Sequence, residues 1–332
     1  MSEKQRIMSG IQPTGNLHIG RYFGAIQNWV NLQDEYECFY CVVNYHAITM
    51  PYKPDKLRQA SWDVVFNLIA CGVKPEYLFI QSMVPEHTEL GWILGAFTSY
   101  GYLSRMTQFK DKSVQATGTS KDAYISSALF TYPVLQAADI LIYNAHKVPV
   151  GKDQEQHLEL TRNIAQRFNQ QTNSDYFNVP EALYTPFAKI LSTADPTIKM
   201  SASKGDKHNI DVFADPARMK KQIMSAVTDS GDQTEGVMSP GVENLFSLLK
   251  ATNENELHAT LMQDYQNGNL QYGHLKGEVA TALINFTQPM RDKREELLSN
   301  RKAVKNQIKS SGYDIRQKAI QRLKEVKDLA GL

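Results

Sequence analysis

Short runs of apolar residues alternate with amphipathic helical patterns over the first half of the chain. Residues 38–43 and 78–80 are apolar runs of the length expected for buried strands. Between them, residues 54–71 place their apolar side chains three or four positions apart, which is the spacing of one helix face. Strands that alternate with helices predict a parallel sheet covered on both faces. We therefore expect an α/β fold in this half of the chain.

The alternation continues, and helical spacing takes over after residue 212. We expect helices at 88–100 and 132–143, a strand at 148–150, and a helix that carries Leu160, Ile164 and Phe168. Residues 196–211 are rich in Lys, Ser, Gly, Asp and Asn, a composition typical of an exposed, mobile loop. From residue 212 onward the strand signals disappear, so an all-helical part follows the sheet.

The stretch from Pro13 to Gly20 is the most distinctive part of the first strand–helix unit. It follows a short apolar run and precedes a helix whose apolar residues recur at spacings of three and four. In a parallel sheet, the turn between a strand and its helix binds phosphates through helix N–H groups and the helix dipole. His18, one turn into that helix, can donate a hydrogen bond to a phosphate oxygen. The alternative is a loop with two glycines and an incidental surface histidine.

The overall composition is that of a globular protein without an extreme charge. Of 332 residues, 42% are hydrophobic and 21% charged, and the net charge is +1. This length allows about two domains. Three cysteines are an odd number, which favours a reducing compartment over a disulfide framework. The polar N-terminus lacks an apolar signal core and no apolar run spans a membrane, so we expect a cytoplasmic protein with no membrane partner.

Two features could mark partners but are ambiguous. Cys38 and Cys41 have metal-ligand spacing, yet strand alternation puts them on opposite faces and no second cysteine pair exists, so we predict no metal site in the protein. The last fifty residues contain twelve basic and six acidic residues. A solvated helix face is the simpler account of this excess, and contact with a phosphate backbone is the alternative.

A second candidate for chemistry lies in the predicted loop, at Lys199-Met200-Ser201-Ala202-Ser203. A lysine on a loop after the last strand can close over a polyphosphate and neutralise charge as pyrophosphate leaves. Taken alone, the loop is equally a generic polar surface segment. Together, Leu-His-Ile-Gly near the N-terminus and Lys-Met-Ser-x-Ser after the sheet resemble the two signatures of class I aminoacyl-tRNA synthetases.

Six further segments resemble tryptophanyl-tRNA synthetases in particular. They occur in the same order along the chain, at 9–15, 106–112, 132–133 with 137–141, 148–154, 226–230 and 272–277. The resemblance implies a Rossmann-like catalytic domain for ATP and tryptophan at 1–200. It also implies a helical domain at 201–332 that meets the tRNA anticodon, with a last helix that can pack back on the catalytic domain.

The chemistry implied by this resemblance is ligation of L-tryptophan to tRNA(Trp). The carboxylate of tryptophan attacks the α-phosphate of ATP, pyrophosphate leaves, and the adenylate passes to the 3′ end of the tRNA. Positioning and charge stabilisation are then the tasks of the protein. By resemblance, Mg²⁺ accompanies ATP through phosphate oxygens and water. A homodimer that holds the tRNA across both subunits is also implied.

The resemblance assigns the site residues one by one. The catalytic residues would be Lys112, Lys199, His18 and Lys204. The ATP-binding residues would be Gln12, Pro13, Thr14, His18, Gly20, Arg21, Gly151, Lys152, Asp153, Ile190, Lys199, Met200, Ser201, Ala202 and Ser203. The tryptophan-binding residues would be Asp139, Tyr132, Gln136, Met8, His46, Val148, Val150 and Gln154.

Amino-acid selection can be argued from the predicted helix at 132–143. Tyr132, Gln136, Asp139 and Tyr143 are spaced four, three and four, so they share one face. A carboxylate among apolar neighbours needs a donor, and an indole N–H is only a donor. An amino acid without that N–H would leave Asp139 unpaired and be rejected. A structural ion pair or a helix cap is the alternative role of Asp139.

Two positions depart from the bacterial tryptophanyl pattern. Gln136 stands where methionine is usual, and with Tyr132 and Asp139 it is similar to tyrosyl-tRNA synthetases. Ala202 stands where the loop signature has lysine, and Lys204 lies two residues further on. Three alternatives therefore remain: a tyrosine–tRNA ligase, a nucleotidyltransferase for a small metabolite, and a silent paralogue that binds tryptophan or RNA.

Overall fold

Five parallel strands form the sheet in the described part of a computed structural model of the protein, which covers residues 4–107, 125–151, 154–184, 190–228 and 237–332. The strands are β1 (Arg6–Ile11), β2 (Glu37–Val42), β3 (Leu78–Ile80), β4 (Lys147–Pro149) and β5 (Glu181–Leu183). Their order in the sheet is β3-β2-β1-β4-β5, and every neighbouring pair is parallel. This confirms the predicted parallel α/β fold, although no pattern in the sequence predicted β5.

Both faces of the sheet are buried, as the alternating pattern predicted. Along β2, Cys38, Tyr40 and Val42 join one hydrophobic core, whereas Phe39 and Cys41 join the other. Because side chains alternate along a strand, each of these cores lies on a different face. The two cysteines therefore point to opposite sides, as expected, and all three cysteines of the chain are buried free thiols.

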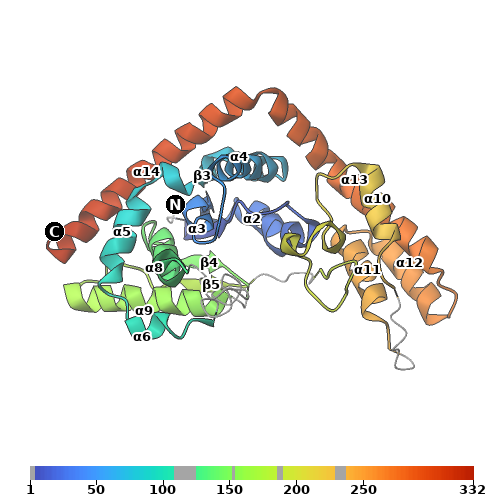
Figure 1. Ribbon diagram of the computed structural model, residues 1–332, viewed down its shortest axis with the longest axis horizontal. Helices are drawn as coiled ribbons and strands as arrows, with labels where there is room; N and C mark the ends of the chain where they lie inside the picture. Colours follow the sequence, from blue (N-terminus) through green and yellow to red (C-terminus); the bar gives the residue numbers. More distant parts are fainter. Residues whose placement is uncertain (1–3, 108–124, 152–153, 185–189, 229–236) are drawn as a thin grey trace.

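The connections between strands supply the covering helices (Figure 1). Between β1 and β2 lies one continuous helical segment, made of α1 (Ile19–Arg21), the π-helical η1 (Tyr22–Ile26) and α2 (Gln27–Leu32). Between β2 and β3 lie α3 (Asn44–Ala47), α4 (Pro54–Ala70) and η2 (Pro75–Tyr77), and between β3 and β4 lie η3 (Gln81–Met83), α5 (Glu86–Gly95), α6 (Tyr100–Leu103) and α8 (Ser127–Leu141). The helix α9 (Glu155–Thr172) connects β4 to β5.

Helical structure follows the sheet to the end of the chain, as predicted. Two short 3₁₀ turns come first, η5 (Ala202–Lys204) and η6 (Asp206–His208). The helices are α10 (Pro216–Met224), α11 (Pro240–Ala251), α12 (Asn255–Gln266), α13 (Tyr272–Ser299) and α14 (Arg301–Ala330). In Figure 1 the first four of these helices lie together on the right, away from the sheet, and α14 runs back across the top to the C-terminus.

The last helix, α14, lies along the first half of the chain rather than beside the other C-terminal helices. Its residues Ile315, Ala319 and Leu323 are buried in the core that also contains α5, α8 and α9. Several of its basic side chains pair with acids of the first half: Arg301 with Asp63, Arg316 with Glu86, Lys318 with Glu37, and Lys327 with Glu89. Four of the basic residues counted in the sequence therefore attach α14 to the first half of the chain through ion pairs.

Three predictions of local structure were wrong in part. The helix expected at 88–100 ends at Gly95, and α8 covers residues 127–141 rather than 132–143. Pro133 is the seventh residue of α8, and it lacks the N–H that would bond to the carbonyl of Leu129. The loop predicted at 196–211 is not uniformly exposed, because Met200 and Ile210 are 2% and 0% exposed and belong to the core. A polar majority in the sequence concealed these two anchors.

Candidate active site

A cavity of about 760 Å³ opens at the carboxyl ends of the central strands. Its wall includes Gly10 and Ile11 from β1 and Pro149 to Gly151 from the end of β4. These two strands are neighbours in space, and the chain turns away from each to opposite sides of the sheet. A parallel sheet binds its ligand at such a switch point, because helix N-termini and loops diverge there and leave a crevice.

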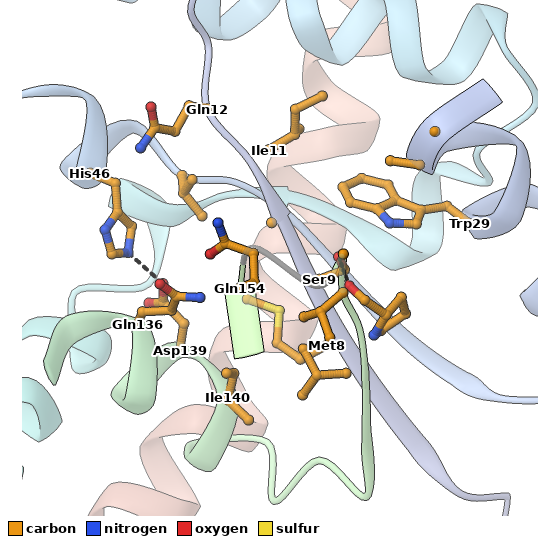
Figure 2. A pocket seen from close by; sticks show the side chains of 18 of the residues that line it. Met8, Ser9, Ile11, Gln12, Trp29, His46, Gln136, Asp139, Ile140 and Gln154 are labelled. Carbon is orange, nitrogen blue, oxygen red and sulfur yellow. Dashed lines mark hydrogen bonds and ion pairs between the residues drawn. The ribbon is translucent and has the colours of Figure 1, made fainter. Parts of the chain in front are cut away.

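The residues that the resemblance assigned to tryptophan all line this cavity. They are Met8, His46, Tyr132, Gln136, Asp139, Val148, Val150 and Gln154. Figure 2 shows Asp139 on α8 joined to His46, with Gln136 beside it, Ile140 below, Met8 to the right and Trp29 across the cavity. A polar end with a carboxylate therefore faces an apolar and aromatic remainder. That combination suits an amino acid with a large ring.

The carboxylate of Asp139 already has protein hydrogen-bond donors without any ligand. Its Oδ1 accepts hydrogen bonds from Gln81 Nε2 at 2.8 Å and His87 Nδ1 at 2.6 Å, and its Oδ2 accepts from His46 Nε2 at 2.8 Å and from Gln81 Nε2 at 3.0 Å. Burial alone would raise the pKa of Asp139, but the hydrogen bonds from the two histidines outweigh it and lower the pKa to about 2. The argument that an empty or wrongly filled pocket leaves Asp139 unpaired was therefore wrong.

A second hydrogen bond fixes the tyrosine of this wall. Tyr132 is 7% exposed, and its hydroxyl lies 2.9 Å from Nε2 of His157. His157 is the third residue of α9 and is fully buried, so its role is packing and hydrogen bonding. Burial raises the pKa of Tyr132 to about 12, so its hydroxyl keeps its proton at neutral pH.

His18 caps the helix after β1 instead of lying one turn inside it. Its Nδ1 accepts the backbone N–H of Arg21 at 3.1 Å, and the side chain is almost fully buried. Burial, and then the positive charges of Arg21 and Lys199, lower the pKa of His18 to about 4. The ring is therefore neutral at pH 7, with its proton on Nε2, because Nδ1 is the acceptor. A neutral donor at a helix N-terminus is suited to an anionic oxygen.

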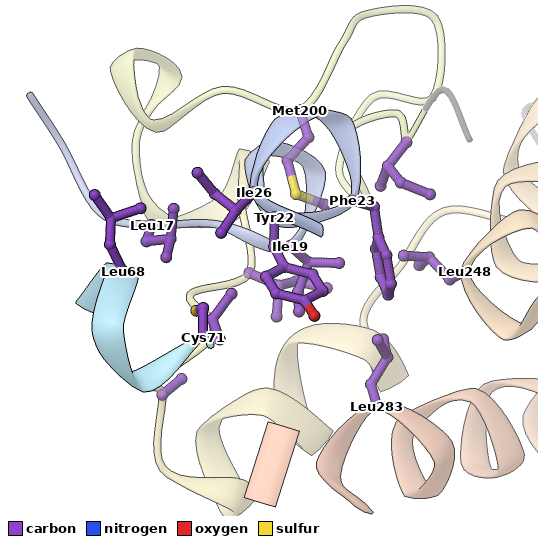
Figure 3. Packing of buried hydrophobic residues seen from close by; sticks show 14 of the residues in the cluster. Leu17, Ile19, Tyr22, Phe23, Ile26, Leu68, Cys71, Met200, Leu248 and Leu283 are labelled. Atoms are coloured by element: carbon purple, nitrogen blue, oxygen red, sulfur yellow. The ribbon is translucent and has the colours of Figure 1, made fainter. Parts of the chain in front are cut away.

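The turn around His18 and the Lys199 loop are in direct contact. Ile19 donates its N–H to Ile210 O at 2.8 Å. A Cβ on Gly15 would lie 2.6 Å from the Cβ of Ala202, and one on Gly20 would lie 3.1 Å from that of Met200. Met200 itself packs on the helix that carries Tyr22, Phe23 and Ile26, as Figure 3 shows. The two signatures therefore form one unit, as their pairing in the sequence suggested.

The residues assigned to catalysis or to ATP binding divide into three groups. Those that line the cavity are Gln12, Arg21, Gly151 and Ser201. Those beside it, in the turn, the loop or the core beneath them, are Pro13, Thr14, His18, Gly20, Ile190, Lys199, Met200, Ala202, Ser203 and Lys204. The side chains of Ile190 and Met200 are buried in the core rather than turned to the cavity. Lys112, Lys152 and Asp153 lie outside the described residues.

Some residues of the site were not predicted from the sequence. Trp29 is 2% exposed, lines the cavity and stacks on Tyr40 with ring centroids 4.6 Å apart. The cavity is also lined by three residues that precede Trp29 at spacings of three and four, Arg21, Gly24 and Asn28. This spacing could have identified the helix face that lines the cavity. Gln81 and His87 meet Asp139 from η3 and α5, and no spacing in the sequence connects them with α8.

No group of three or more histidine, cysteine, aspartate or glutamate side chains that could hold a metal ion occurs in the described ranges. Within those same ranges, no helix combines the length with the apolar character needed to cross a membrane.

A parallel sheet with a glycine turn and a lysine loop that meet over its switch point defines a nucleotide-binding α/β enzyme of the class I synthetase type. The family model for tRNA synthetases class I (W and Y) matches residues 1–288, so the chain belongs to that family.

Individual relatives agree with this assignment. The chain is 44% identical to a tryptophan–tRNA ligase of Clostridium tetani, with 99% of this chain and 96% of the relative aligned. Among solved structures, tryptophanyl-tRNA synthetase of Campylobacter jejuni complexed with ADP and tryptophan superposes with a TM-score of 0.84 at 34% identity, covering 98% of this chain and all of the other. The Mycoplasma pneumoniae enzyme gives a TM-score of 0.86 at 32% identity, covering 99% and 98%.

Proposed function

We propose that the cavity at the carboxyl ends of β1 and β4 is where this tryptophan–tRNA ligase forms tryptophanyl-adenylate. The enzyme is a class I aminoacyl-tRNA synthetase, and its substrates are ATP, tryptophan and tRNA(Trp). The observation that carries the proposal is that all eight residues assigned to tryptophan line one cavity with Gln12, Arg21, Gly151 and Ser201. One continuous space thus joins the two sets of residues that must meet for the reaction.

The amino acid would lie with its ring against Met8, Val148 and Val150 and its indole N–H toward Asp139. Because Asp139 is ionised and acts only as an acceptor, an indole N–H is a matching donor, and it would share a carboxylate oxygen with the protein donors already there. Gln136 lines the same wall one turn earlier on α8 and would hold the amino group or carboxylate of the substrate. Tyr132 and His46 complete this polar end.

ATP would lie between the glycine turn and the Lys199 loop. The neutral His18 would donate its Nε2–H to a phosphate oxygen, and Arg21 and Lys199 would supply positive charge. Lys199 is exposed and close enough to His18 to lower its pKa, so its ammonium lies on the phosphate side of the turn. Mg²⁺ would arrive with ATP, held mainly by phosphate oxygens and water. Each of these groups would position a substrate or neutralise its charge, and none would form a covalent bond to a substrate.

Pyrophosphate exchange with each amino acid in turn tests the assignment directly. Tryptophan should support exchange of labelled pyrophosphate into ATP, whereas tyrosine and phenylalanine should not. The tyrosine alternative rests on Tyr132, Gln136 and Asp139 alone, and tyrosine-dependent exchange without tryptophan dependence would establish it. A silent paralogue would bind tryptophan and exchange nothing, and a nucleotidyltransferase for another metabolite would ignore both amino acids.

The two halves of the chain would share the tRNA, with residues 1–200 as the catalytic domain and residues 201–332 meeting the anticodon in a cytoplasmic homodimer. Trp92 on α5 and Tyr100 on α6 are 85% and 76% exposed, and aromatic side chains of this kind are enriched at interfaces. A second copy of the chain is the occupant we assign to this face. Light scattering should give a dimer for the wild type and a shift toward monomer for Trp92→Arg with Tyr100→Arg.

A further inference from the structure

The Lys199 loop begins with a short antiparallel bridge between Leu191 and Lys199. The residues on either side make its hydrogen bonds: Met200 N donates to Ile190 O at 3.2 Å, and Ser192 N donates to Ile198 O at 2.9 Å. In this type of pair the backbone groups of Leu191 itself point away from the partner strand. The bridge thus has an outer edge that needs partners of its own, because unpaired polar backbone groups are costly to bury.

A single side chain from the helical part of the molecule satisfies that edge. Asn244 lies on α11 and is 3% exposed. Its Oδ1 accepts the N–H of Leu191 at 2.8 Å, and its Nδ2 donates to the C=O of Leu191 at 3.1 Å. The side-chain amide therefore pairs with Leu191 as a third strand would. It uses one acceptor and one donor for a single residue of the bridge.

The helix that carries Asn244 is itself firmly anchored. Leu245, Leu248 and Leu249 of α11 are buried in the core shared with the helix after β1. At its start, α11 lies against the backbone of Val227, and a Cβ on Gly241 would lie only 2.1 Å from Val227 O. α11 thus gives the outer edge of the bridge a fixed reference point in the helical part of the molecule.

We propose that Asn244 is a positioning residue for the activation of tryptophan by ATP. Through Leu191, it sets the position of the Lys199 loop over the cavity. This inference rests on the proposed function of that loop. Asn244 lies in neither the cavity wall nor the two signatures, so it acts through the bridge and touches no substrate. A shift of α11 would carry the bridge, and hence Lys199, with it. The helical part of the molecule and the ATP site are coupled by this amide.

The chain contains a matched amide clamp elsewhere. Asn169 of α9 donates its Nδ2 to Phe177 O at 2.8 Å, and its Oδ1 accepts the N–H of Phe177 at 2.9 Å. The same two hydrogen bonds therefore hold a backbone residue that belongs to neither the loop nor the cavity. Removing Asn169 measures the structural cost of losing such a clamp without moving Lys199.

The experiment compares Asn244→Ala and Asn169→Ala in the full-length enzyme. Each is assayed for thermal unfolding, for pyrophosphate exchange with tryptophan, and for backbone hydrogen exchange. Both should lower Tm by similar amounts. Only Asn244→Ala should lower kcat for exchange, by about tenfold to a hundredfold, because a misplaced catalytic loop loses transition-state contacts. The tryptophan KM should stay within about twofold of the wild type, since the amino-acid pocket is not touched.

A second variant guards against simple misfolding. Asn244→Asp keeps the shape of the side chain and the bond from the Leu191 N–H but presents an oxygen to the Leu191 carbonyl. It should fold and still lower kcat. The amides of Ser192 and Met200 should exchange faster in both Asn244 variants, and that of Leu191 in Asn244→Ala. Equal losses of kcat in the Asn169 and Asn244 variants, or unchanged protection of these amides, would overturn the inference. A wild type without tryptophan-dependent exchange would refute the proposed function instead, and amide protection would still decide whether Asn244 holds the bridge.

Discussion

Nδ1 of His87 lies 2.6 Å from Oδ1 of Asp139, and both side chains are almost completely buried. Because the carboxylate is ionised and can only accept, His87 donates from Nδ1. Its Nε2 then accepts the hydroxyl of Tyr143 at 2.7 Å. A chain of directed hydrogen bonds thus runs from Tyr143 through His87 to the carboxylate in the cavity wall, and it holds that carboxylate in one orientation.

We expect removal of this support to weaken tryptophan binding without affecting ATP. His87→Leu deletes one donor to a buried carboxylate, which should cost about 1–3 kcal/mol and raise the tryptophan KM by about tenfold or more. Tyr143→Phe deletes only the hydroxyl behind His87, so its effect should be smaller and of the same sign. Steady-state exchange kinetics with each substrate varied in turn would measure both.

The informative result is whether each variant changes the tryptophan KM more than the ATP KM. Equal effects on the KM values for ATP and tryptophan would mean that His87 maintains the whole fold rather than the orientation of Asp139. His258→Leu provides a histidine control, since that ring packs on Phe246 of the helical part and lies outside the cavity.

The buried cap at His18 should make folding stability depend on pH. The native ring stays neutral down to about pH 4, whereas the ring in the unfolded chain takes up a proton below about 6.5. The unfolded state therefore binds more protons in this interval, and stability should fall on acidification from about pH 6.5 to 4, by up to about 3 kcal/mol. His18→Asn keeps a capping acceptor and should remove this part of the slope.

Urea unfolding followed by circular dichroism at several pH values would measure the difference between wild type and His18→Asn. Identical slopes in the two proteins would show that the proton uptake belongs to other groups. In the same interval, the rate of pyrophosphate exchange by the wild type should lack an inflection near the ordinary pKa of histidine. The reason is that the ring of His18 does not titrate there.

The sequence predicted the sheet and both signature loops because each depends on local spacing. Apolar runs at β2 and β3 and the helical face of α4 are visible within short windows of the chain. By contrast, β5 is three residues long and half-exposed, so its pattern carries no apolar signal. The buried anchors Met200 and Ile210 lie within a polar stretch, and only the surrounding tertiary structure buries them.

The candidate site shows the same division. The eight residues that motif resemblance assigned to tryptophan line one cavity. The resemblance did not predict what holds Asp139, since Gln81 and His87 lie 58 and 52 positions away in the sequence and meet it only in the folded chain. It also gave no sign of Asn244, whose partner Leu191 is 53 positions away. Supporting contacts of this kind are set by packing, and packing is not periodic.

The close contact between the two signatures predicts an unusual sensitivity at Gly15. This residue has a φ of +67°, and an added Cβ would lie 2.6 Å from that of Ala202. Gly15→Ala should therefore lower stability by more than the ~1–2 kcal/mol of the left-handed backbone alone, and exchange should slow as the loop is displaced. Combining it with Ala202→Gly should restore the part due to the contact.

Gly277→Ala is the matched control for this pair, because that glycine lies within α13 and its Cβ would meet no atom within 4 Å. It should stabilise the protein by up to about 1 kcal/mol and leave exchange unchanged. Thermal unfolding and pyrophosphate-exchange assays on the three variants test the argument. A double variant no better than Gly15→Ala would assign the whole loss to the backbone and none to the loop contact.

Lys199 and Lys204 should differ sharply although both are exposed lysines of one loop. The charge of Lys199 acts on His18, whereas that of Lys204 acts on Asp195, away from the glycine turn. Lys199→Ala should therefore lower the exchange kcat by at least about a hundredfold while tryptophan binding, measured by calorimetry, is unchanged. Lys204→Ala should cost less than about tenfold, since the charge of Lys204 acts on Asp195 rather than on His18. Equal losses in the two variants would mean that Lys204 reaches the phosphates in the closed loop, and a normal rate in Lys199→Ala would remove the loop from the chemistry.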